Sequence, residues 1–160
     1  MVALVAAAIR TLVIVFIAIY LPVLAAEPIA AAHNLPAEAK RAVSADRIYL
    51  LYVSRLACPY CALLEKNVLF PMLRNDDYLA WVDLHELSWE GGKVVDFDRH
   101  SRTAIEIISR YGVIGTPTLL FLDGAGNELT DRIIGYHSED FYWHYFDKAI
   151  RKARKKLLGD

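Results

Sequence analysis

Blocks of hydrophobic residues recur along the chain with the lengths and spacing of strands. Two nearly unbroken apolar runs, 47–53 (RIYLLYV) and 117–122 (PTLLFL), are typical of central strands covered on both faces. A third strand is predicted around 80–87. A fourth is predicted at 128–134, after the turn sequence at 123–127 (DGAGN). The last two strands are therefore expected to form a hairpin.

Segments with helical spacing lie between and around these strands. Helices are predicted over 36–45 and over 62–69, where Pro71 is expected to kink or end the helix because it lacks an N–H group. Two more are predicted over 101–111 and 138–157. The order is helix, strand, helix, strand, helix, strand, strand, helix. It predicts an α/β fold with a central mixed β-sheet flanked by helices.

The first residues of the chain have a different pattern. Residues 11–24 (TLVIVFIAIYLPVL) form a continuous apolar run after Arg10, as in the apolar region of a signal peptide. Cleavage could follow Ala25 or Ala32, since small residues surround both positions. The stretch at 2–9 is also apolar, which leaves an uncleaved membrane anchor as the alternative.

The composition fits one folded domain behind this leader. Hydrophobic residues make up 56% of the chain and charged residues 23%, which is typical of a globular protein. The 18 Lys and Arg residues nearly balance the 19 Asp and Glu residues, so no nucleic-acid partner is expected. We predict a signal peptide or membrane anchor at 1–26, which is a possible membrane tether, a linker at 27–36 and one domain at 37–160.

The candidate chemistry lies in two cysteines, Cys58 and Cys61, which flank Pro59 and Tyr60 between a strand and a helix. At this spacing they can close a small disulfide and reopen it without unfolding the domain. Free amides at the start of a helix stabilise an anion, so Cys58 is predicted to have a lowered pKa and to attack as a thiolate. Cys61 is predicted to be more buried and to resolve the mixed disulfide.

The cysteine pair has two other interpretations. A structural zinc site needs four ligands, and the chain has no second CxxC pair. The histidines also fall outside familiar ligand spacing; they are His33, His85, His100, His137 and His144. We therefore expect neither a metal nor another cofactor. Inert cysteines in the core are the other alternative.

The cysteine pair and two motifs downstream of it together resemble a known protein family. Cys58-Pro59-Tyr60-Cys61, followed by 112–118 (GVIGTPT) and 119–124 (LLFLDG), strongly resembles the thioredoxin superfamily over about residues 37–158. The resemblance implies a thioredoxin fold and a cis Thr116–Pro117 bond that faces the cysteines and offers a backbone edge to the substrate. We expect substrate contacts from Pro59, Tyr60, Thr116 and Pro117.

Two features depart from thioredoxin itself. Tyr52 occupies the position, six before Cys58, where thioredoxin has a buried carboxylate that helps to move protons. Proton transfer to and from Cys61 must then use water or another group. The segment between Cys61 and Pro117 is also longer, with 88–98 as the predicted excursion, and in this it is similar to exported bacterial thioredoxin-like proteins.

These features predict a thiol–disulfide oxidoreductase that acts on exported protein disulfides in the periplasm or another extracytoplasmic space. We expect a reductase, which in an oxidising compartment needs a membrane thiol electron donor. A glutathione-dependent enzyme is one alternative, because Cys-Pro-Tyr-Cys is also the glutaredoxin motif. A non-catalytic, redox-sensing module that binds a partner is the other.

Overall fold

The strand β2 (Ile48–Ser54) lies at the centre of the fold, and all seven of its residues are buried. The computed structural model describes residues 29–159, so the predicted leader at 1–26 lies outside the described residues. The strand order of the main sheet is β1 (Ala30–Ala31), β3 (Val82–Ser88), β2, β6 (Thr118–Leu122) and β7 (Ile133–Ile134). β3 is parallel to β1 and β2, whereas β6 is antiparallel to β2 and β7. The predicted mixed sheet is confirmed.

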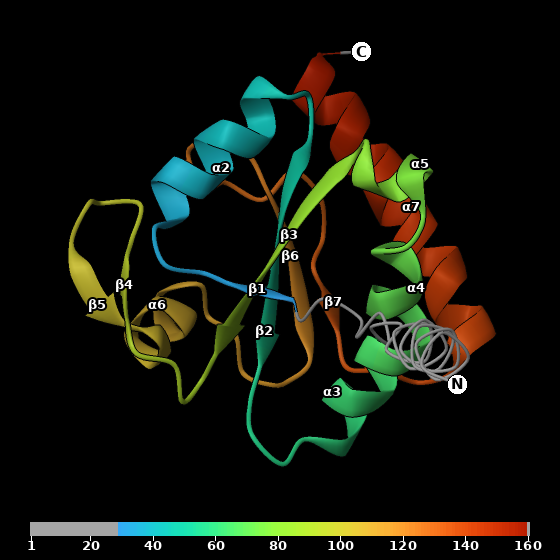
Figure 1. The fold of residues 1–160 in the computed structure, drawn as a ribbon, viewed down its shortest axis with the longest axis horizontal. Helices are drawn as coiled ribbons and strands as arrows, with labels where there is room; N and C mark the ends of the chain where they lie inside the picture. The colour runs from blue at the N-terminus through green and yellow to red at the C-terminus, as the bar shows by residue number, and fades with distance from the viewer. Residues whose placement is uncertain (1–28, 160) are drawn as a thin grey trace, which may run out of the picture.

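Helices cover both faces of this sheet (Figure 1). One face carries α2 (Leu35–Ser44) and α6 (Ala104–Arg110). The other face carries α3 (Pro59–Leu64), the π-helix η1 (Glu65–Leu69), α4 (Phe70–Met72), α5 (Asp76–Leu79) and α7 (Glu139–Leu158). The arrangement has three layers, as the alternation of strands and helices predicts. Within residues 29–159, no helix has both the length and the apolar character needed to cross a membrane.

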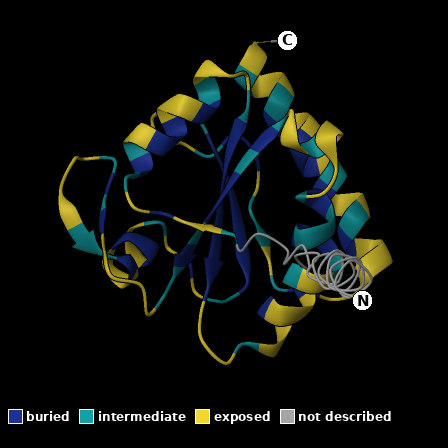
Figure 2. Cartoon of the chain, in the orientation of Figure 1, coloured by how far each residue is buried: buried dark blue, intermediate teal, exposed yellow. Residues whose placement is uncertain are grey.

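Side chains of β2 divide the hydrophobic core into two halves. Leu50 and Tyr52 point toward α3, η1 and α7, whereas Leu51 and Val53 point toward α2 and α6. This follows from the two-residue period of a strand. Figure 2 shows the result as a buried central sheet between helices that are exposed only on their outer sides. Burial of each large aliphatic or aromatic side chain contributes about 1.5–3 kcal/mol, so this central strand anchors the loop that follows it.

The segment predicted as a linker contains an additional strand. Ala30 and Ala31 pair with His85 and Glu86 of β3, which makes β1 a two-residue edge strand. A short run of alanines has no periodicity that predicts a strand, because alanine is depleted in strands. Asn34 then caps α2 through a hydrogen bond from the N–H of Ala37 to its side chain, 3.1 Å long.

Pro71 was expected to kink or end the helix after the cysteines, and it does not end it. The helical segment widens into the π-helix η1 and continues through Pro71 to Met72. In a regular α-helix, the Pro71 ring would clash with the carbonyl group of Asn67. The wider turn lies directly before the proline, which is a known setting for such bulges.

The predicted excursion and the last strands also differ in detail. Part of the excursion forms a hairpin of β4 (Lys93–Val95) and β5 (Ser101–Thr103). The next helix therefore begins at Ala104 rather than at residue 101, after a capping box between Thr103 and Glu106. The predicted strand at 128–134 forms regular pairs only in β7, since Glu128 makes a single bridge to Leu122.

Candidate active site

A tight turn delivers the cysteine pair from the end of β2 to the start of α3. Ala57 has a φ angle of +52°, in the left-handed region that a residue with a side chain seldom adopts. Oε2 of Glu90 accepts a hydrogen bond of 2.9 Å from the N–H of Leu56 and holds the same turn from the other side. The turn places Cys58 at the N-cap of α3, with Pro59 in the first helical turn.

Cys58 and Cys61 form a disulfide, with their Cα atoms 5.2 Å apart. The backbone N–H of Cys61 also donates a hydrogen bond to Sγ of Cys58 at 3.2 Å. Cys61 is 3% exposed, whereas Cys58 is only partly buried. As the sequence predicted, Cys61 is the more buried of the two. An incoming sulfur atom can therefore reach Cys58 but not Cys61.

The loop before β6 lies against the disulfide. The Thr116–Pro117 peptide bond is cis, the isomer that the resemblance implies. The Thr116 hydroxyl group donates to Sγ of Cys58 at 3.6 Å, and the carbonyl oxygen of Pro117 accepts from the N–H of Gly135 at 2.8 Å. Pro117 is buried, while Thr116 is partly exposed. The fold thus brings together the two segments that the sequence singled out.

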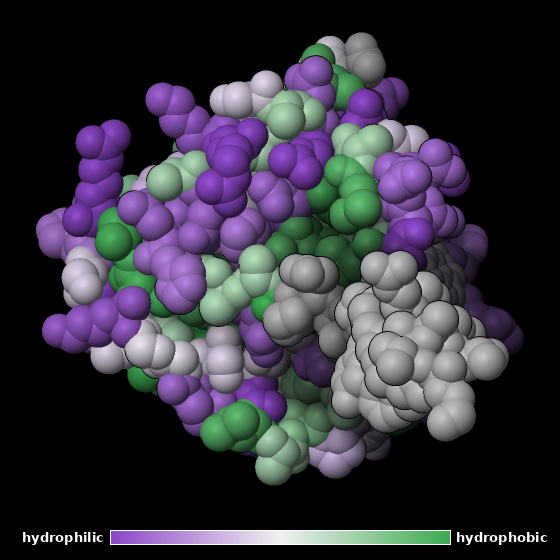
Figure 3. Space-filling model, viewed as in Figure 1, coloured by the Kyte–Doolittle hydropathy of each residue, from purple (hydrophilic) through white to green (hydrophobic). Residues whose placement is uncertain are grey.

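Hydrophobic side chains flank the disulfide on the surface. Tyr60 is 58% exposed, Leu56 is 71% exposed, and Ile114, two residues before Thr116, is 88% exposed. Pro59 is also exposed. Figure 3 shows hydrophobic side chains at the lower end of the molecule, where the loop between β2 and α3 lies in Figure 1. Large exposed apolar groups around a reactive pair suit contact with another polypeptide.

A cavity of about 490 Å³ adjoins the cysteine pair and contains two carboxylates that the sequence analysis missed. Glu65 and Glu86 line it together with both cysteines. The Tyr52 hydroxyl group donates to Oε1 of Glu65 at 2.8 Å. Burial of the phenol and this hydrogen bond raise the pKa of Tyr52 far above its usual range, so it stays protonated. Glu65 could have been found from its position four residues after Cys61, on the same helix face.

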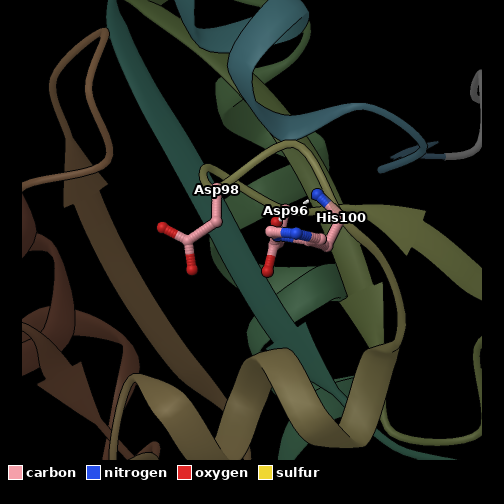
Figure 4. Close-up of side chains that lie close together, drawn as sticks. All are labelled: Asp96, Asp98 and His100. Atoms are coloured by element: carbon pink, nitrogen blue, oxygen red, sulfur yellow. Dashed lines mark hydrogen bonds between the residues drawn. The ribbon is translucent and has the colours of Figure 1, made fainter.

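A second cluster of polar side chains lies between β4 and β5, away from the cysteines. Donor atoms of Asp96, Asp98 and His100 lie within 4.8 Å of one another (Figure 4). The Asp96 carboxylate accepts from the backbone N–H of His100 and pairs with Arg102. Asp98 pairs with Arg110. Because arginines already neutralise both carboxylates, we assign no metal to this cluster.

Comparisons with known proteins agree with this geometry. The thioredoxin of Thermus thermophilus has 22% sequence identity and a TM-score of 0.56, and the match covers 82% of this chain and 93% of that chain. The periplasmic thioredoxin SoxS of Paracoccus pantotrophus has 23% identity and a TM-score of 0.47, with 67% of this chain and 99% of that one covered. At 22% identity, the match to the Thermus protein shows a shared fold and nothing more specific. No curated protein matches the chain.

A protein-family match covers most of the chain. The family described as the thioredoxin-like domain matches residues 35–150, which run from the start of α2 into α7 and include both cysteines. The resemblance in the sequence, the fold and the disulfide at the start of α3 all agree with this match. The chain therefore belongs to the family of thioredoxin-like domains.

Proposed function

We propose that this protein is a thiol–disulfide oxidoreductase that exchanges the Cys58–Cys61 disulfide with disulfides of other proteins. The observation that carries the proposal is the unequal exposure of the two cysteines. Cys58 is accessible at the start of a helix and Cys61 is buried behind it. A nucleophile needs access to its substrate, whereas a resolving thiol needs access only to the nucleophile.

The chemistry divides into two exchange steps. In the reduced protein, the Cys58 thiolate attacks a substrate disulfide, forms a mixed disulfide and releases one substrate thiolate. The Cys61 thiolate then attacks Sγ of Cys58 and releases the second substrate thiolate. Two electrons pass to the substrate, and the protein is left with the disulfide described above. A thiol donor must reduce it before the next cycle.

Substrate contacts are expected on the surface around Cys58. Leu56 and Tyr60, within two residues of Cys58, and Ile114, two residues before Thr116, offer exposed apolar side chains. Among residues 29–159, no backbone hydrogen bond involves Thr116, so its N–H and C=O groups can pair with an extended substrate chain. Pro59, Tyr60, Thr116 and Pro117 are thus placed to border a bound segment.

The direction of exchange and the location of the protein are finer parts of the proposal. The apolar run at 11–24 supports export from the cytoplasm, and the protein then reduces disulfides of exported proteins with electrons from a membrane thiol donor. Arg55, a cation near the pair, lies 5.9 Å from the centre of the Trp89 ring, an arrangement typical of a cation–π contact. Because Arg55 contacts Trp89, we do not expect it to stabilise the Cys58 thiolate strongly. A pair without strong thiolate stabilisation is expected to be reducing rather than oxidising.

Trapping of mixed disulfides tests the proposal. A Cys61→Ser variant should accumulate a covalent adduct with a protein that carries an accessible disulfide, because the resolving thiol is missing. A matched Cys58→Ser variant should form no adduct, because Cys61 is buried. Non-reducing electrophoresis, followed by release with a reductant, measures both. Adducts through Cys61 alone, or no adduct from either variant, would overturn the proposal.

A further inference from the structure

The attack of Cys61 on the mixed disulfide requires a proton acceptor inside the protein. Cys61 is 3% exposed, and a thiol reacts only after it loses its proton. Burial disfavours the charged thiolate, so proton loss from Cys61 needs a base within reach. The cavity beside Cys61 provides two carboxylates, Glu65 and Glu86.

Glu65 is the better placed of the two. Its backbone N–H donates to the carbonyl oxygen of Cys61, so the two residues lie one helical turn apart on the same face. The π-helix η1 begins at Glu65, and turns of this kind are frequent at functional sites. Both side chains line the same cavity, which is large enough for a water molecule to carry a proton between them.

Tyr52 holds the Glu65 carboxylate in place. The Tyr52 hydroxyl group donates to Oε1, and within residues 29–159 no hydrogen bond engages Oε2 of Glu65. Tyr52 is fully buried, and because its pKa is raised it keeps its own proton and cannot serve as the base for Cys61. Tyr52 is thus a positioning residue. It leaves one carboxylate oxygen free to face the cavity.

Glu86 has a different environment on β3. It lies opposite Tyr52 in the register of β2 and β3, and its Oε1 accepts a hydrogen bond from the Ser54 hydroxyl group. Glu86 belongs to a strand rather than to the helix that carries the cysteines. Glu86 thus reaches the cavity from the sheet, whereas Glu65 lies within one helical turn of the buried thiol.

We propose that Glu65 accepts the proton of Cys61 during resolution of the mixed disulfide and returns it to the departing substrate thiolate. This inference rests on the proposed function. The Cys61 S–H bond breaks and Glu65 becomes neutral, directly or through one water molecule. The Cys61 thiolate then forms the bond to Sγ of Cys58 as the bond from Cys58 to the substrate sulfur breaks. Glu65 gives the proton to the released thiolate and is again ionised, so no other oxidant or reductant is needed.

Other titratable and charged groups lie around Glu65. Tyr52 faces it from β2, Glu86 faces the same cavity from β3, and Arg55 lies on the loop between β2 and α3. Cys58 faces the cavity from α3, and Tyr142 of α7 lies near Tyr52. A test of Glu65 must therefore compare variants at these neighbours.

An aromatic disulfide that releases a coloured thiolate separates the two steps in stopped-flow absorbance. The first thiolate is released when Cys58 attacks, and the second when Cys61 resolves the adduct. We expect Glu65→Gln to slow the second phase by about ten- to a hundredfold at pH 7, because general base catalysis contributes at least this much. The first phase should change by less than about twofold. When the rate of the second phase is measured against pH, Glu65→Gln should need a higher pH than the wild type to reach the same rate.

Three further variants complete the test. Glu65→Asp keeps a carboxylate, so its second phase should fall between those of the wild type and Glu65→Gln. Tyr52→Phe loses the hydroxyl group that orients Glu65, so it should slow the second phase and shift its pH profile by less than Glu65→Gln does. Glu86→Gln removes the other carboxylate of the same cavity, and it should slow the second phase by less than Glu65→Gln does, since Glu65 holds the proton-accepting role.

The outcomes separate the inference from the proposed function. A wild-type protein that releases both thiolates, with Glu65→Gln matching its second phase and pH profile, would overturn the role of Glu65 alone. A larger loss in Glu86→Gln than in Glu65→Gln would also overturn it. A wild-type protein that releases no second thiolate would overturn the proposed function and this inference together.

Discussion

The Thr116 hydroxyl group donates to Sγ of Cys58 at 3.6 Å, although 58 positions separate the two residues along the chain. This contact joins the loop before β6 to the start of α3. In the reduced protein, the same donor would face the Cys58 thiolate, and donors that bond to the charged form favour it. The contact therefore connects the two halves of the candidate site chemically as well as spatially.

Replacement of Thr116 by valine, which has nearly the same shape, should lower the alkylation rate of Cys58 at pH 7 by about two- to tenfold. The estimate corresponds to the loss of one hydrogen bond of about 0.5–1.5 kcal/mol. Iodoacetamide labelling of the reduced protein measures the rate. At a pH where the thiol of both proteins is fully ionised, the rates should converge. Equal rates at pH 7 would show that Thr116 does not stabilise the thiolate.

The turn between β6 and β7 offers a matched pair of glycines. Gly126 has a φ angle of +85°, and a Cβ atom there would lie 2.5 Å from Cδ2 of Phe97. At Gly124, an added Cβ would lie 3.6 Å from Cγ2 of Val43, an ordinary contact. We expect Gly126→Ala to lower the free energy of unfolding by about 1–3 kcal/mol.

The control is Gly124→Ala, which should change the free energy of unfolding by less than about 1 kcal/mol. Urea denaturation of both variants and the wild type gives the comparison. If the two alanine variants were equally stable, the placement of the Phe97 ring against this turn would be wrong.

A buried carboxylate on α2 predicts how stability depends on pH. Glu38 Oε1 accepts hydrogen bonds from the N–H groups of His33 and Asn34, both 2.9 Å, and Oε2 accepts from Tyr49 at 2.7 Å. Burial raises the pKa of Glu38, but these hydrogen bonds and the nearby His85 together hold it below its ordinary value of 4.5. The folded protein thus binds the proton of Glu38 less readily than the unfolded chain does.

The sign follows from proton linkage. The contribution of Glu38 is fully present above about pH 4.5, the ordinary value, and is lost as the pH falls through the lower pKa of the folded state. Glu38→Gln should therefore be less stable than the wild type at pH 7, with a shallower loss below pH 4.5. Urea denaturation between pH 7 and pH 3 measures this. Glu139→Gln, at an exposed position, should parallel the wild type, and a parallel curve for Glu38→Gln would contradict the prediction.

The reduction potential of the cysteine pair tests the direction of exchange. We expect a potential closer to that of thioredoxin, about −270 mV, than to that of DsbA, about −120 mV. Equilibration with glutathione redox buffers, followed by measurement of the reduced fraction, gives the value. A potential near that of DsbA would replace the reductase with an oxidant.

The sequence predicted the central part of the fold because its signals are strong and local. The apolar run at 47–53 is a buried strand to within a residue, and the cysteines lie at the start of the next helix. In contrast, Ala30 and Ala31 form a strand only because the edge of β3 is available to them. Such pairing depends on tertiary contacts that a two-residue alanine segment does not encode.

In the candidate site, too, some features follow from sequence motifs and others depend on tertiary contacts. The family resemblance implied that the Thr116–Pro117 bond faces the cysteine pair, but it did not predict the hydrogen bond from the Thr116 hydroxyl group to Cys58. The spacing of Glu65, four residues after Cys61, is visible in the sequence, but the role proposed for it depends on the hydrogen bond from Tyr52 and on a cavity shared with Cys61, which only the structure shows. A glutamate in the middle of a helical segment is otherwise typical of a solvated helix face.

The number of substrate disulfides reduced by each protein molecule distinguishes an enzyme from a module that binds one partner. The protein, a protein disulfide substrate in large excess and a dithiol donor are mixed, and released substrate thiols are counted over time. We expect each molecule to reduce many disulfides, at a rate above that with the donor alone, and we expect Cys58→Ser to lose this turnover. Reduction that stops at one disulfide per molecule would contradict an enzyme and indicate a module that binds a single partner.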